Sequence, residues 1–178
     1  RYVAKLLAEK LGIKFYDKEI ITKLAKETGL SEEYIEENEQ KRTALANLET
    51  DQVTGLSTRD ELFIKESELI KKLAKKDSCV IVGRCADFIM KDNKNAVKVF
   101  IYSNMEDKIK RVNKFYGVDK EKAEKEIKNT DKQRSNHYKH YTDREWKEYS
   151  NYDICINSDT LGVEKSADVI YNMIQNRK

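Results

Sequence analysis

Residues 152–158 read YDICINS and are followed by TLGVE at residues 160–164. This stretch predicts a short buried strand, a tight turn and a helix that closes the domain. Far earlier in the chain, the apolar run CVIV at residues 79–82 predicts a second buried strand, which ends on Gly83 and Arg84. Two buried strands that each end at a polar or charged residue and lead into a helix favour an open α/β sheet. In such sheets, ligands bind at the carboxyl ends of the strands.

The size and composition of the chain indicate one globular domain. Its 178 residues are enough to bury a substantial core, so we expect a single domain over residues 1–178. Charged residues make up 38% of the chain and apolar residues 39%, which is polar but still typical of a globular protein. The net charge of +3 is too small to favour nucleic acid as a partner, and the interspersed Lys and Glu residues fit solvated helix faces.

The cysteines and the hydropathy pattern favour the cytoplasm. Three cysteines, an odd number without a C-x-x-C pair, argue against a disulfide scaffold. Cys79 and Cys155 lie in the predicted buried strands, where a free thiol behaves as a small apolar group. No apolar run approaches the roughly 18 residues of a membrane helix, and no signal peptide is recognisable. We therefore expect no membrane partner.

The rest of the chain alternates helical and extended patterns. Helices are predicted from Tyr2 to Gly12, from Lys18 to Gly29 and over much of 117–149. Two further helices are predicted to start at capping boxes, one formed by Ser57 and Asp60 and the other by Ser103 and Glu106. Two further strands are predicted at 13–16 and 97–102. This order predicts a parallel sheet with helices on both faces. The weakly patterned residues 40–58 and the charged residues 117–149 are expected to be the least rigid parts of the chain.

The segments in this order resemble the cytidylate-kinase-like branch of the nucleoside monophosphate kinases. The resemblance rests on residues 1–12, FYDKEI at 15–20, VIVGR at 80–84, VKVFI at 97–101 with Glu106, Lys108 and Arg111, residues 128–134, and residues 152–170. It implies a P-loop α/β fold with a helical lid at about 117–149. It also implies transfer of the γ-phosphate of ATP to a nucleoside monophosphate, CMP or dCMP above all, with Mg²⁺.

The start of the chain departs from the usual motif of this class. The chain contains no G-x-x-x-x-G-K-[ST] phosphate loop, and its first helical pattern begins without a capping residue. We therefore expect the family's first strand and its phosphate loop to precede Arg1. In the branch that the chain resembles, an arginine follows the glycines of this loop. The resemblance implies that Arg1 is this arginine and that it contacts ATP.

Two strand ends provide candidate residues for the acceptor. Arg84 follows a flexible glycine, and its planar guanidinium can bind two phosphate oxygens without losing its charge; the resemblance implies that it faces the acceptor monophosphate. The alternative is a surface ion pair, for example with Asp87. Asp17 could contact the ribose or base of the acceptor or orient an arginine. Its alternative is to cap the helix that starts at Lys18.

The lid region provides the remaining candidates. The resemblance implies that Arg111 and Arg134 stabilise the transferring phosphoryl group and that Asp131 contacts the same ligand. Asp131 and Arg134 are three residues apart, so a simple surface pair on a helix is the alternative. His137 and His140 have a spacing that could bind a metal. No further ligand lies near them in the sequence, so we expect no metal site in the protein itself.

Two other functions remain open. The missing Lys-Ser/Thr signature motivates a nucleotide-binding sensor or partner-binding module without kinase activity. A kinase for another small acceptor is the third possibility, because a fold does not determine its substrate. The single tryptophan, Trp146, could stack on a base, but packing against the sheet is the simpler expectation.

Overall fold

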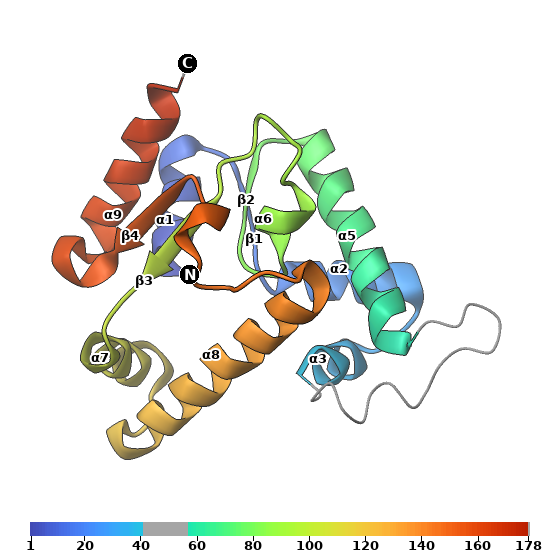
Figure 1. Ribbon diagram of the computed structural model, residues 1–178, viewed down its shortest axis with the longest axis horizontal. Coiled ribbons are helices and arrows are strands. Elements are labelled where there is room, and N and C mark those ends of the chain that lie inside the picture. Colours follow the sequence, from blue (N-terminus) through green and yellow to red (C-terminus); the bar gives the residue numbers. More distant parts are fainter. Residues whose placement is uncertain (41–56, 178) are drawn as a thin grey trace.

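The computed structural model describes residues 1–40 and 57–177 as a mixed α/β molecule (Figure 1). Its elements are, in order, α1 (Tyr2–Leu11), β1 (Lys14–Tyr16), α2 (Glu19–Thr28), α3 (Glu32–Gln40), α5 (Thr58–Lys76), β2 (Cys79–Ile81), α6 (Ala86–Ile89), β3 (Val99–Tyr102), α7 (Met105–Tyr116), α8 (Lys120–Thr142), the 3-10 helix η1 (Tyr149–Asn151), β4 (Ile154–Asn157) and α9 (Ser158–Gln175). The predicted alternation of helices and strands is confirmed for these residues. The turn expected after β4 lies inside α9, where Gly162 has a non-helical φ of 72° and ψ of 175°.

The four strands form two separate parallel pairs. β1 pairs with β2, placing Phe15 opposite Val80, and β3 pairs with β4, placing Phe100 opposite Cys155. The prediction of one continuous parallel sheet is therefore corrected, because β2 and β3 share no ladder of hydrogen bonds. The parallel direction of the strands was predicted correctly. The further strand expected before Arg1 stays a prediction.

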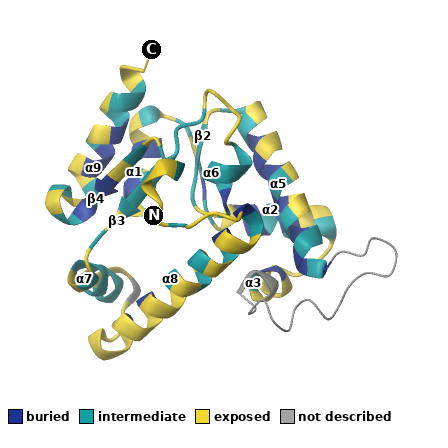
Figure 2. Ribbon diagram, viewed as in Figure 1, coloured by how far each residue is buried: buried dark blue, intermediate teal, exposed yellow. Residues whose placement is uncertain are grey.

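Helices cover both faces of the β1–β2 pair. Cys79 and Ile81 pack against an apolar cluster whose buried members come mainly from α2, α3 and α5. Val80, which points to the other face, packs against a second cluster built on α1 and α9. Neighbouring residues of a strand point to opposite faces, so this short strand contributes to two cores. Figure 2 shows the buried residues gathered on the inner sides of these helices.

The β3–β4 pair is covered by helices on one face and by aromatic side chains on the other. Val99 and Ile101 pack against the α1–α9 cluster. On the opposite face, the Phe100 ring lies 4.9 Å from the Tyr152 ring and 5.6 Å from the Trp146 ring, measured between centroids. Trp146 thus packs against the sheet, as the simpler expectation had it.

Some local predictions need correction. Cys155 lies in β4 but is exposed, whereas Cys85 is the buried cysteine. The cap of α7 is Asn104, whose side chain accepts a hydrogen bond from the Asp107 backbone, rather than Ser103. The Ser57 cap of α5 is confirmed, since its hydroxyl accepts a bond from the Asp60 backbone N–H at 3.2 Å.

The charged segment expected to form a lid is largely the long helix α8, which crosses the molecule from α7 toward α5 (Figure 1). One stripe of the helix is buried, and it consists of Ala123, Ile127, Tyr138 and Thr142. The expected loop at 40–58 lies outside the described residues except at its ends. None of the described helices is long and apolar enough to cross a membrane.

The α2–α3–α5 cluster should account for much of the stability. Ile70 on α5 is fully buried, whereas Ile64 on the same helix is 44% exposed. We expect Ile70→Ala to lower the free energy of unfolding by about 2–5 kcal/mol, because it removes buried methyl groups and leaves a cavity. The matched control Ile64→Ala should change it by no more than about 0.5 kcal/mol. Urea unfolding followed by circular dichroism measures both values, and equal losses would contradict the assignment of this core.

Candidate functional site

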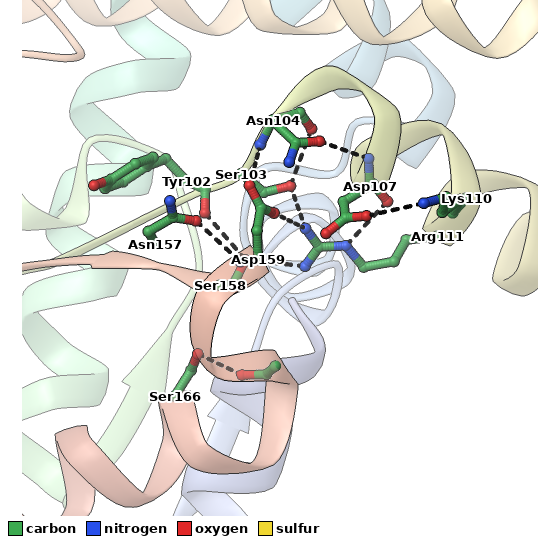
Figure 3. A network of polar contacts seen from close by, with 11 residues as sticks. Tyr102, Ser103, Asn104, Asp107, Lys110, Arg111, Asn157, Ser158, Asp159 and Ser166 are labelled. Atoms are coloured by element: carbon green, nitrogen blue, oxygen red, sulfur yellow. Dashed lines mark hydrogen bonds and ion pairs between the residues drawn. The ribbon is translucent and has the colours of Figure 1, made fainter.

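The carboxyl ends of β3 and β4 are joined by one arginine. Arg111 on α7 donates hydrogen bonds to the hydroxyls of Ser103 and Ser158, the latter at 3.0 Å, and lies 3.4 Å from the Asp159 carboxylate (Figure 3). Its Nε also bonds to the Asp107 carbonyl at 3.3 Å. Since Ser103 directly follows β3 and Ser158 directly follows β4, this guanidinium is fixed at the strand ends.

The carboxylate in this network stays ionised. Burial raises the pKa of Asp159, but the bond from the Asn104 backbone N–H, together with Ser103 and the charge of Arg111, outweighs burial and lowers the pKa below its usual value. The Asn104 bond measures 2.6 Å. An ionised Asp159 beside Arg111 partly neutralises the arginine and helps to hold it in place.

A second ion pair joins the start of α1 to the end of β1. The Arg1 Nε lies 2.5 Å from the Asp17 carboxylate. Asp17 therefore orients an arginine, which is one of the roles expected for it. It does not cap the next helix through its side chain, because α2 has Lys18 at its N-cap position and no side-chain capping bond.

Asp131 on α8 holds two cations. Its carboxylate lies 2.6 Å from the Lys108 ammonium on α7 and 3.6 Å from the Arg134 guanidinium. The Arg134 side chain is 61% exposed. The Asp131–Arg134 contact is thus the i,i+3 pair that the sequence offered as the alternative. Because the Arg134 end of the pair is exposed, the contact contributes little stability, and Arg134 can leave Asp131, which keeps Lys108, at small cost.

Electrostatics links these groups into one cluster. The charged groups of Asp17, Arg134 and Arg111 all lie close enough to the backbone nitrogen of Arg1 to act on it electrostatically. Arg1, Asp17, Arg111 and Arg134 therefore lie within electrostatic range of one another. We call these residues, with Lys108 and Asp131, the Arg111 cluster.

Arg84 has a different and more deeply buried partner. Its Nη1 lies 2.6 Å from the Oε1 of Glu66 on α5, and the two side chains are only 15% and 3% exposed. The expected alternative partner, Asp87, instead accepts a hydrogen bond at 2.6 Å from the Tyr138 hydroxyl of α8. Burial is the main reason why the pKa of Asp87 is raised.

His137 lies close to Arg84. Its pKa is lowered to about 4, chiefly by burial and then by the positive charges of Arg59, Arg84 and His140. Arg59 itself is buried on α5, and its guanidinium lies 5.5 Å from the Tyr141 ring centre. We call Arg59, Glu66, Arg84 and His137 the Glu66 cluster.

Helix α8 brings the two clusters near each other. Arg134 belongs to the Arg111 cluster and His137 to the Glu66 cluster, and a separation of three residues is a rise of about 4.5 Å along a helix. The contacts thus divide the expected site residues: Arg1, Asp17, Arg111, Asp131 and Arg134 fall in one cluster and Arg84 in the other. Each arginine expected at the site has an acidic partner, as their mutual repulsion requires.

Several residues of these clusters were not expected from the sequence. Ser158 and Asp159 carried no signal of their own as site residues, and Lys108 was named only as part of the family resemblance. Glu66 did carry one, because it falls between Leu62 and Ile70 in the apolar stripe of α5, where a carboxylate is out of place. Among the described residues, no three His, Cys, Asp or Glu side chains converge as metal ligands.

The chain is similar to known proteins over most of its length. The model of the cytidylate kinase-like family matches residues 1–160. The crystal structure of an uncharacterized protein from Eubacterium ventriosum ATCC 27560 is 30% identical, with a TM-score of 0.75, and the match covers 98% of this chain and 90% of that one. No curated protein matches the chain.

The lowered pKa of His137 predicts that the stability of the protein depends on pH. Between about pH 6.5, the ordinary value, and about pH 4, the unfolded chain binds a proton at His137 that the folded protein does not bind. The free energy of unfolding should therefore fall on acidification through this range, by up to about 1.4 kcal/mol per pH unit from this group. The raised pKa of Asp87 acts in the opposite direction, so the difference between wild type and His137→Gln isolates the histidine.

Two measurements check this expectation. Urea unfolding at pH 7 and pH 5 should show a larger loss for wild type than for His137→Gln. In wild type, the imidazole NMR signals of His137 should titrate near pH 4. A midpoint near 6.5 would show that His137 is neither buried nor close to the two arginines.

Proposed function

Since the family model spans most of its residues, the chain belongs to the cytidylate kinase-like family, and we propose that it transfers the γ-phosphoryl group of ATP to a nucleoside monophosphate, with CMP or dCMP as the preferred acceptor. Membership in this family indicates a kinase-like, nucleotide-related function. The observation that carries the proposal is the pair of arginine clusters that meet along α8, where Arg134 of one cluster and His137 of the other are three residues apart. Two neighbouring groups of arginines suit two nucleotides whose phosphates must meet.

The Glu66 cluster suits the acceptor. Arg84 follows β2 at the carboxyl end of the strand, and its side chain is almost completely buried, so it loses little freedom when it binds a monophosphate. Asp17 follows β1, the neighbour of β2 in the sheet, and already orients Arg1. In this proposal Asp17 and Asp131 hold the side chains of Arg1 and Lys108 in place and accept hydrogen bonds from polar groups of the bound nucleotide.

The Arg111 cluster suits the transferring group. An oxygen of the acceptor phosphate forms a bond to the γ-phosphorus while the bond to the bridging oxygen breaks, and ADP leaves with the electron pair. This reaction needs alignment and positive charge more than covalent help from the protein. Arg111 supplies a charge fixed at the strand ends, whereas the exposed Arg134 can move from Asp131 to the phosphates. Arg1 faces the donor phosphates.

Magnesium would accompany the ATP. Mg²⁺ at nucleotide sites usually takes one or two carboxylates and several phosphate and water oxygens, so a protein cage of three ligands is not required. The two carboxylates of the Arg111 cluster, Asp17 and Asp131, are each already paired with a cation, so phosphate and water oxygens would supply most of the ligands of the ion. The ion, when bound, neutralises phosphate charge. We place the reaction in the cytoplasm, where reduced Cys79, Cys85 and Cys155 are expected.

A coupled ATP-consumption assay of the full-length protein, with a panel of nucleoside monophosphates, tests the proposal. Production of ADP that depends on CMP or dCMP supports it. Tight nucleotide binding without turnover of any acceptor would instead support the sensor or partner-binding function. Turnover of other acceptors only would move the assignment to another substrate.

Replacing Arg84 should weaken acceptor binding. Arg84→Ala removes a charge-assisted contact to the monophosphate worth about 1.5–3 kcal/mol, which is about 10–150-fold in the dissociation constant of CMP. Isothermal titration calorimetry of CMP measures it. Arg177→Ala is the control. Arg177 lies near the C-terminus, donates hydrogen bonds to the backbone carbonyls of Lys94 and Ala96, and belongs to neither arginine cluster. Unchanged affinity in a folded Arg84→Ala variant would remove Arg84 from the acceptor site.

Replacing Arg134 should act on turnover. If the guanidinium reaches the phosphoryl group mainly in the transition state, Arg134→Ala lowers kcat more than it raises the KM of either substrate. Steady-state kinetics separates the two effects. Arg134→Lys keeps the charge and should recover part of the rate. A rise in KM with an unchanged kcat would assign Arg134 to ground-state binding instead.

A further inference from the structure

Glu66 occupies a position that should be apolar. It lies on the buried stripe of α5, between Leu62 and Ile70, and is 2% exposed. A carboxylate at such a position must give up its water, which costs free energy even when a cation is near. A buried ion pair can often be replaced by apolar side chains without loss of stability. Stability alone therefore does not explain why a glutamate stands here.

The backbone that carries Arg84 is equally unusual. Gly83, Arg84 and Cys85 have φ angles of 76°, 57° and 52°, so three consecutive residues are left-handed. This conformation is unfavourable for residues with a Cβ atom, and such strain is found mainly where function requires a particular geometry. The turn starts directly after β2 and sends the Arg84 side chain to α5, where Glu66 binds its end at 2.6 Å.

We propose that Glu66 is a positioning residue, which holds the Arg84 guanidinium in the orientation that receives the acceptor monophosphate; this inference rests on the proposed function. The guanidinium is a planar group with five N–H donors in a rigid fork. A buried carboxylate that binds one terminal nitrogen restricts the direction in which the rest of the fork can point. A monophosphate then meets an arginine whose side-chain freedom has already been lost, which favours binding.

The surrounding charges explain why a carboxylate suits this position. Arg84 shares its surroundings with Arg59 and His137, and both arginines lower the pKa of His137. Without Glu66, its carboxylate would no longer offset the charges of Arg59 and Arg84, and the Arg84 guanidinium would be held less firmly in this orientation. An apolar residue of the same size would fill the stripe but could not hold the guanidinium.

Two substitutions separate positioning from packing. Glu66→Leu restores the apolar stripe but leaves the Arg84 guanidinium without this carboxylate, so the melting temperature should fall. At a temperature where the variant is still folded, CMP binding should weaken on the order of tenfold, within the coupling range of residues in contact. Glu66→Gln keeps the shape but loses the charge, and should give a smaller loss in the same direction. The control is Glu68→Gln on the same helix, because Glu68 is exposed and its partner is the surface residue Lys65. It should bind CMP like wild type.

A double-mutant cycle shows whether Glu66 acts through Arg84. In an Arg84→Ala background, Glu66→Leu should cause no further loss of CMP affinity. In wild-type background it should raise the KM of the acceptor and leave kcat within about twofold, because it alters ground-state binding rather than the transition state. Additive losses of affinity, or equal affinity of wild type and both folded Glu66 variants, would overturn the inference.

A readout without nucleotide distinguishes this inference from the proposed function. Side-chain ¹⁵N NMR of the free protein reports how fast the Arg84 guanidinium rotates. It should rotate slowly in wild type and in Glu68→Gln, and faster in Glu66→Gln. Failure of CMP to bind wild type, with Arg84 still held by Glu66, would refute CMP as the acceptor, and failure of every nucleoside monophosphate in the panel would refute the phosphate role of this orientation. Equal rotation in wild type and Glu66→Gln would refute the positioning role itself.

Discussion

The arrangement of this molecule depends on the burial of one apolar cluster between α1 and α9. The two strand pairs are not hydrogen-bonded to each other, yet Val80 of β2 and Val99 of β3 both pack against this cluster. Its buried centre includes Val3 and Leu7 of α1 and Ile170 of α9. Hydrophobic burial has no preferred direction, so the hydrogen-bond ladders within each pair must set the parallel direction of the strands. Together they bring the carboxyl ends of the strands to the region that α7 and α8 cover.

At these strand ends, the molecule keeps its arginines paired with acidic groups. Arg1, Arg84, Arg111 and Arg134 each have a carboxylate partner within 3.6 Å. The pairs differ in burial, from the enclosed Arg84 to the exposed Arg134, so the arginines suit different steps of a reaction. A buried, fixed arginine favours binding of a ground-state phosphate, whereas an exposed one can form its contact late in the reaction. Helix α8 carries the exposed Arg134 and also His137, which lies beside the buried Arg84.

Local patterns in the sequence predicted the elements well and their assembly less well. The strand predicted at residues 79–82 and the Ser57 cap follow from neighbouring residues; the structure confirms the cap and has the strand at Cys79–Ile81, one residue shorter. The separation into two sheets depends on pairing between distant segments, which apolar periodicity does not encode. Likewise, Arg84 was predicted from its place after a strand, but its partner Glu66 lies on another element. The roles of the site residues stay predictions, whereas their acidic partners are now identified.

The central claim is that two phosphate-binding clusters meet along α8. A crystal structure of the full-length protein with a bisubstrate analogue, cytidine and adenosine joined by five phosphates, tests it most directly. The account predicts that the phosphate chain runs from Arg134 and Arg111 to Arg84, with the cytidine on the side of Glu66. A phosphate chain bound away from α8, or an analogue that binds with Arg84 and Arg134 both turned from it, would contradict the account.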